Sequence, residues 1–144
     1  MNVLLVAAMM TLAAAGGTGG PARQAAPRSV RDGVYTTAQA NRGKTVYDEK
    51  CAACHGTMAS VTPDMAPLLN DHVFRAAWND RSLADLFERI RDTMPQNDPG
   101  TLPPQQTVDL MAYILSANNL PAGDVVLADD VDTLKQIRLD AGQP

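Results

Sequence analysis

The chain has 144 residues, of which 45% are hydrophobic, 19% are charged and only 4% are aromatic, and its net charge at pH 7 is −4. This length predicts one domain, and the composition is that of a soluble globular protein rather than of a disordered or membrane-embedded one. The acidic balance argues against nucleic acid as a partner, because binding to phosphates needs an excess of lysine and arginine.

The N-terminus has the pattern of an export signal. Residues 3–15 are apolar except for Thr11, and small residues follow up to Gly20. This apolar stretch matches the core of a signal peptide and is shorter than the ~20 residues that span a bilayer. We therefore predict a cleaved signal peptide over residues 1–15, ending at the latest near residue 20, and a mature chain without a membrane span. No Lys or Arg precedes the apolar stretch, so an uncleaved interfacial anchor stays open as an alternative.

A stretch rich in Gly, Ala, Pro and Arg follows at residues 16–34, without an apolar period, and predicts a flexible leader. The first helix is expected to begin near Thr36. Gln39, three residues later, completes a capping box with it. We expect this helix to run to about Ala53, followed by loop signals over 56–70.

A second helix is predicted after a short helical turn over 74–78. Ser82 and Asp85 form its capping box. Its apolar residues recur at helical spacing and bury one face; they are Leu83, Leu86, Phe87 and Ile90. Pro95 ends the helix and favours an extended backbone at Met94.

The last main helix is predicted over residues 104–117. Pro104 suits its first turn, because the proline nitrogen needs no hydrogen-bond acceptor there. It is stopped by Asn118, Asn119 and Pro121. No segment gives a convincing strand pattern, so the predicted fold class is all-α.

The C-terminal segment, residues 121–144, is acidic. It contains five aspartates against Lys135 and Arg138 and so contributes −3 of the net −4. Its apolar residues are spaced among these acids; they are Leu127, Leu134 and Ile137. We expect a partly ordered extension that lies along the domain surface, either packed on the domain or trailing from it.

The segment Cys51-Ala-Ala-Cys54-His55 carries the chemistry. Residues three and four apart lie on one face of a helix. Two thiols placed in this way can add to the two vinyl groups on one edge of a haem, while the same turn aims the His55 imidazole at the iron. The pattern therefore predicts covalent attachment of haem c.

Three other uses of the two cysteines fit the sequence less well. A disulfide is the usual fate of two cysteines in an exported chain, but here a histidine follows the pair directly. A thioredoxin-like redox motif needs a βαβ context, which the sequence lacks. Zinc would need more ligands, and the only other histidine is His72.

With these residues in place, the sequence resembles a class I cytochrome c over about residues 35–118. Gly43 lies eight residues before the first cysteine and Tyr47 lies four before it, where the family has a glycine and an aromatic residue. Leu110 and Tyr113 match the apolar–aromatic pair that crosses that glycine. The resemblance implies a class I cytochrome c fold, with three main helices and short turns around one covalent haem.

This resemblance places the cytochrome domain at residues 35–120 and assigns further residues to the haem. Met94, at the end of a helix and before a proline, matches the axial methionine opposite His55; the alternative is that it fills core. Pro67, twelve residues after His55, matches the proline whose carbonyl accepts the ligand N–H. The weaker candidates for the second ligand are Met65, Met111 and His72, whereas Met58 lies too near the attachment segment to reach the opposite face of the haem.

Trp78 is expected beside the haem. Its indole N–H could donate to a haem propionate, or its ring could simply pack at the haem edge, and the sequence favours neither.

The resemblance implies an electron carrier rather than an enzyme. Two axial ligands leave no site on the iron for a substrate, so the haem would cycle between its ferrous and ferric states. The segment from Thr93 to Gly123, together with the residues that follow it, resembles periplasmic monohaem cytochromes associated with quinoprotein dehydrogenases. This likeness implies a periplasmic location, a PQQ-dependent dehydrogenase as donor and a terminal oxidase as acceptor. The alternatives are a haem subunit of a dehydrogenase complex, or an open-site haem protein that binds a gas ligand or peroxide.

Overall fold

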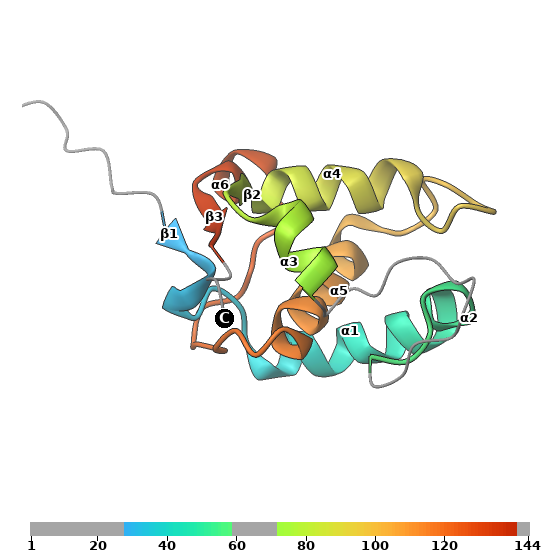
Figure 1. Cartoon of the computed structure of the whole chain (residues 1–144), viewed down its shortest axis with the longest axis horizontal. Helices are drawn as coiled ribbons and strands as arrows, with labels where there is room; N and C mark the ends of the chain where they lie inside the picture. Colours follow the sequence, from blue (N-terminus) through green and yellow to red (C-terminus); the bar gives the residue numbers. More distant parts are fainter. Residues whose placement is uncertain (1–27, 59–71, 141–144) are drawn as a thin grey trace, which may run out of the picture.

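Helices dominate the computed structural model of the chain, which describes residues 28–58 and 72–140 (Figure 1). This confirms the all-α fold class. The two longest helices, α1 (Thr37–Lys50) and α5 (Pro104–Ala117), cross and contact each other more extensively than any other two elements among the described residues. Helix α4 (Leu83–Thr93) packs against α5. Within the described residues, no helix is long and apolar enough to cross a membrane.

Helix α1 begins as expected and ends earlier. Thr36 accepts from the backbone N–H of Gln39, whose side chain accepts from the backbone of Thr36, so the predicted capping box is confirmed. The helix ends at Lys50 rather than near Ala53, because Cys51 leaves helical geometry with φ at −121°. A separate turn, α2 (Ala52–His55), follows.

The later helices match their sequence signals. A short helix, α3 (His72–Trp78), stands where a helical turn was expected, and Ser82 forms its capping box with Asp85 at the start of α4. Met94 follows α4 with an extended backbone, ψ 150°. Pro104 occupies the first turn of α5. These four predictions are confirmed.

Helices α1 and α5 touch at Gly43. A Cβ atom there would overlap the backbone carbonyl of Asp109, so only glycine allows this close approach. The Asp109 side chain accepts two hydrogen bonds from the exposed Arg42 guanidinium, Nε–Oδ2 at 2.7 Å and Nη2–Oδ1 at 2.8 Å. Beside the crossing, the rings of Tyr47 and Tyr113 meet with their centroids 5.4 Å apart.

Substitution of Gly43 by alanine is expected to destabilise the fold by about 3 kcal/mol, because backbone atoms of α5 cannot yield as a side chain would. Helix propensity alone would predict a gain of about 1 kcal/mol. Thermal unfolding checks the sign. Thr45→Ala, on the exposed side of the same helix, is the control and should change the melting temperature little. An unchanged or raised melting temperature for Gly43→Ala would contradict the close crossing.

Three short strands form a sheet that the sequence did not reveal. They are β1 (Arg28–Ser29), β2 (Arg81–Ser82) and β3 (Ile137–Leu139), in the order β1-β3-β2. Strand β3 pairs parallel with β1 and antiparallel with β2. Strands of two or three residues are too short to show the alternation that identifies a strand in a sequence.

The end of the predicted leader is also structured. Residues 28–34 contain β1 and the 3-10 turn η1 (Val30–Asp32), and Ser29 and Asp32 form a capping box at the start of η1. Val30 and Val34 are fully buried. The flexible leader was predicted to extend through residue 34; these seven residues depart from that prediction, because pairing with β3 holds them in place.

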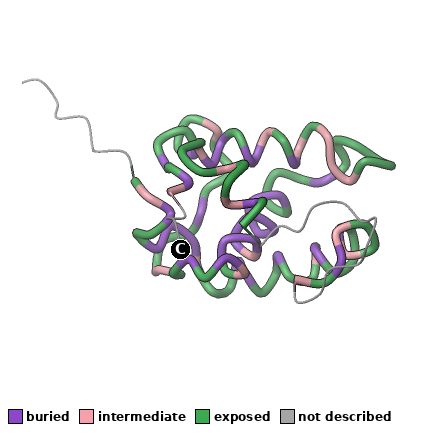
Figure 2. Tube along the Cα trace, viewed as in Figure 1, coloured by how far each residue is buried: buried purple, intermediate pink, exposed green. Residues whose placement is uncertain are grey.

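The C-terminal segment contributes to the core over residues 121–140. It contains α6 (Val131–Lys135) and β3, and it has buried stretches (Figure 2). Four of its apolar side chains are at most 2% exposed; they are Leu127, Leu134, Ile137 and Leu139. The Gln39 amide of α1 holds this segment by donating to the Leu127 carbonyl at 2.9 Å and accepting from its N–H at 2.8 Å. The segment is therefore continuous with the helical core.

Candidate functional site

The two cysteines and His55 occupy a single turn. The backbone N–H groups of Cys54 and His55 both donate to the Cys51 carbonyl, at 3.1 Å and 2.9 Å. Cys51 is buried, Cys54 is exposed and His55 is half-buried. Both thiols are free. The turn thus presents two unpaired thiols and an imidazole within five residues of sequence.

The two thiols differ in environment. Burial raises the pKa of the Cys51 thiol to about 11, with a smaller contribution from neighbouring Cys54. Cys51 therefore stays protonated at neutral pH.

The far end of the turn is fixed at Gly56. Its N–H donates to the Ala52 carbonyl at 2.9 Å, and its own carbonyl accepts from the Tyr47 hydroxyl at 2.8 Å. Gly56 has φ +71°, which favours glycine. The spacing of Tyr47 from Cys51 was noted in the sequence, but the hydroxyl bond to Gly56 was not foreseen; the choice of tyrosine over phenylalanine was the available signal.

Met94, the predicted second ligand, lies just after α4. It is half-buried and packs against the core, and its N–H donates to the Ile90 carbonyl at 3.0 Å. Figure 1 places α2 and the C-terminal end of α4 toward the same end of the long axis. Met94 is the residue that directly follows this end of α4 in the chain.

The other candidates for the second ligand are dispersed. Met111 is fully buried within α5, and His72 is exposed at the start of α3. Met58, which lies too near the cysteine turn in sequence to reach the opposite face of a haem, is half-buried after α2. Met65 and the predicted hydrogen-bond acceptor Pro67 lie outside the described residues.

Trp78 ends α3 and is half-buried against the core. Its ring lies 6.2 Å from that of Phe74, and the Arg81 guanidinium lies over it at 5.4 Å from the centroid. This contact is of cation–π type. Trp78 is thus packed between an aromatic ring and a positive charge.

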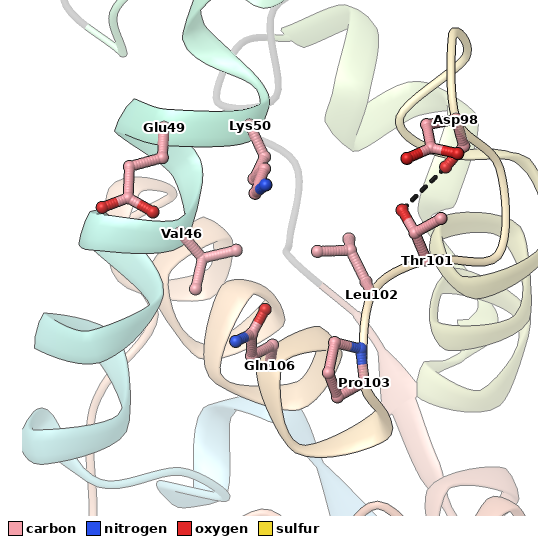
Figure 3. A pocket seen from close by; sticks show the side chains of 8 residues that line it. All are labelled: Val46, Glu49, Lys50, Asp98, Thr101, Leu102, Pro103 and Gln106. Carbon is pink, nitrogen blue, oxygen red and sulfur yellow. Dashed lines mark hydrogen bonds between the residues drawn. The ribbon is translucent and has the colours of Figure 1, made fainter.

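A recess of about 430 Å³ adjoins the cysteine turn (Figure 3). It lies between the last turns of α1, the loop that follows Met94 and the start of α5. Charged, polar and apolar side chains line it; they are Val46, Glu49, Lys50, Asp98, Thr101, Leu102, Pro103 and Gln106. Lys50 directly precedes Cys51. Sequence reasoning missed this recess, because it depends on how a loop folds back toward α1.

Comparison with known proteins decides the family. The profile of the family described as "Cytochrome C oxidase, cbb3-type, subunit III" matches residues 38–114, more than half of the chain. The chain belongs to this family. The resemblance to a class I c-type cytochrome is thereby confirmed. The matched region runs from α1 to α5 and includes both cysteines, His55 and Met94.

Two further comparisons say less about the function of this cytochrome. A chain of the sulfane dehydrogenase SoxCD from Paracoccus pantotrophus matches with a TM-score of 0.50 and 22% identity, over 78% of the cytochrome and 60% of that chain. At this identity the likeness concerns the fold, and the cytochrome spans less than two thirds of that chain. A search of curated proteins finds no match.

The residues fit the cofactor that the family implies, a covalent haem c. The fit rests on the donors: two free thiols and a half-buried imidazole on one turn. Met94, which is half-buried, directly follows α4, whose C-terminal end lies toward the same end of the molecule as α2. Thiols, imidazole and thioether are the groups that attach and ligate haem in c-type cytochromes.

Proposed function

We propose that this cytochrome is a periplasmic electron-transfer protein with a single haem c, attached to Cys51 and Cys54 and ligated by His55 and Met94. The observation that carries the proposal is the turn with two free thiols next to an imidazole. The count of one haem is supported by the sequence, which contains two cysteines in all. Export is supported by the apolar stretch at residues 3–15.

The chain's own residues suit the task. When bound, the haem supplies a one-electron ferrous/ferric couple. The turn at Cys51–Gly56 is closed by backbone hydrogen bonds, so His55 is carried on a fixed frame. A thioether from Met94 favours ferrous iron and so raises the potential. Such rigidity favours rapid electron transfer, because few protein atoms have to move when the haem gains or loses an electron.

The proposed donor is a PQQ-dependent dehydrogenase and the proposed acceptor a terminal oxidase. The donor class is in keeping with the fold match to a chain of a dehydrogenase. The acceptor class is in keeping with a family named for a cytochrome oxidase subunit. Two further residues are proposed to assist at the haem. The carbonyl of Pro67 would accept the hydrogen bond from the His55 imidazole N–H. Trp78 would either pack at the haem edge or donate its indole N–H to a haem propionate.

An absorption spectrum tests the proposal directly. The ferric protein is expected to show the far-red sulfur-to-iron charge-transfer band, and the ferrous spectrum should not change under CO, because both axial positions are taken. Purified full-length protein, expressed with a haem-attachment system, is reduced with dithionite and then exposed to CO. A missing band together with a CO-shifted spectrum would contradict the closed carrier and favour the open-site alternative.

A further inference from the structure

Tyr47 contacts both ends of the cysteine turn. Its backbone carbonyl accepts from the Cys51 N–H at 2.9 Å, and its hydroxyl donates to the Gly56 carbonyl at 2.8 Å. The side chain is fully buried. One residue of α1 therefore brackets the whole segment from the first cysteine to the residue after His55.

The bracket restrains His55 from both sides. The His55 N–H is bonded to the Cys51 carbonyl, and the next residue, Gly56, has both its N–H and its carbonyl engaged. Without the Tyr47 hydroxyl, the buried Gly56 carbonyl would lose the one partner on α1 that ties the end of the turn to a long helix. Greater backbone motion at Gly56 would also allow the His55 imidazole to change its orientation, because His55 and Gly56 are adjacent residues joined by one peptide bond.

We infer that Tyr47 is a positioning residue whose hydroxyl, through Gly56, sets the orientation in which His55 meets the iron. This role rests on the proposed function, since it assigns a task in holding the haem ligand. It goes beyond the packing of the Tyr47 ring against Tyr113. A phenylalanine would keep that packing, whereas only a hydroxyl reaches the carbonyl.

The hydroxyl is well suited to a permanent bond. Burial raises the pKa of Tyr47 to about 12, so it keeps its proton and stays a donor at neutral pH. A donor that never ionises in the working range holds the turn equally in both redox states. The bond is also removed from water, where competition would weaken it.

The test is Tyr47→Phe in the full-length holoprotein, with Tyr35→Phe as matched control. Tyr35 is also buried, and its hydroxyl donates to the Leu120 carbonyl at 2.7 Å, but it lies just before α1, at the opposite end of that helix from α2. Both variants lose one buried tyrosine hydrogen bond and should melt at lower temperature. Only Tyr47→Phe is expected to lower the midpoint potential and to move the paramagnetically shifted NMR resonances of His55 and the haem methyls.

The inference is overturned if Tyr47→Phe leaves potential and NMR shifts unchanged, or if both variants change them equally. Wild-type protein gives a second measurement that does not depend on a variant folding. The Tyr47 hydroxyl proton should exchange slowly with solvent, and rapid exchange would contradict a lasting bond to Gly56. If the wild-type protein carried no covalent haem, the proposed function itself would be contradicted. This outcome is distinguishable from those above, which contradict only the role of Tyr47.

Discussion

Replacing Cys51 and Cys54 together by alanine is expected to abolish covalent attachment of haem. The two thiols are the only ones in the chain, and the turn that carries them ends at His55, so no other group can form a thioether. The loss should be complete rather than graded. Denaturing gel electrophoresis with haem staining, and the mass of the intact chain, measure it directly.

The single variants separate the two attachment points. Cys51 is buried at the end of α1, whereas Cys54 is exposed. Cys51→Ala therefore also removes part of the core at the start of the turn, and we expect a larger loss of stability from it than from Cys54→Ala. Ala53→Ser, at an exposed position of the same turn, is the control and should keep haem. Haem that survives denaturation of the double variant would exclude this turn as the attachment site.

Much of the helical fold follows from short-range signals. Thr36 with Gln39 and Ser82 with Asp85 are pairs three residues apart, and the structure shows both capping boxes. Proline acts just as locally, by removing a donor and fixing φ, and Pro104 stands at the start of α5 as expected. Such features are readable because the interacting groups are neighbours in sequence.

The sheet and the C-terminal segment depend on partners that are distant in sequence. Arg28 pairs with Ile137, and the bond between Gln39 and Leu127 joins residues 88 positions apart. No pattern among neighbouring residues in the sequence predicts such contacts. In the C-terminal segment, aliphatic residues spaced among aspartates predict an extension on the surface, whereas the structure shows that Leu134 is fully buried.

The burial of the C-terminal segment also changes how a docking role could be tested. If the segment trailed from the domain, deletion of residues 121–144 would report on partner binding alone. Because Leu134 and Leu139 lie in the core, deletion would also remove packing and disturb the fold. Substitution of the exposed valines, Val125 and Val126, would leave the core intact and is the cleaner experiment.

At the candidate site, the chemical groups could be predicted from the sequence, whereas the hydrogen bonds that hold them in place are seen only in the structure. The thiols and His55 were found because their spacing is fixed by a helical turn. The bond from the Tyr47 hydroxyl to Gly56 was missed, because spacing does not show whether an aromatic residue acts by its ring or its hydroxyl. The place where α1 ends was also missed, since nothing in Lys50 or Cys51 forbids another helical turn.

Removal of the Met94 thioether is expected to lower the midpoint potential and to open the iron to CO. Loss of a sulfur ligand removes its preference for ferrous iron, and a vacated axial position accepts an added ligand. We expect a fall of at least about 59 mV, a tenfold change in a one-electron equilibrium. Redox titration and the CO difference spectrum measure the two effects.

Two substitutions at this position decide between ligand and core filler. Met94 is half-buried against the core, so Met94→Ala removes both the sulfur and part of the packing. Met94→Leu removes the sulfur but keeps the volume, a change that usually costs less than about 1.5 kcal/mol of stability. A ligand role requires both variants to lose the charge-transfer band and to bind CO. If Met94→Leu kept the wild-type potential and did not bind CO, Met94 would act by packing alone.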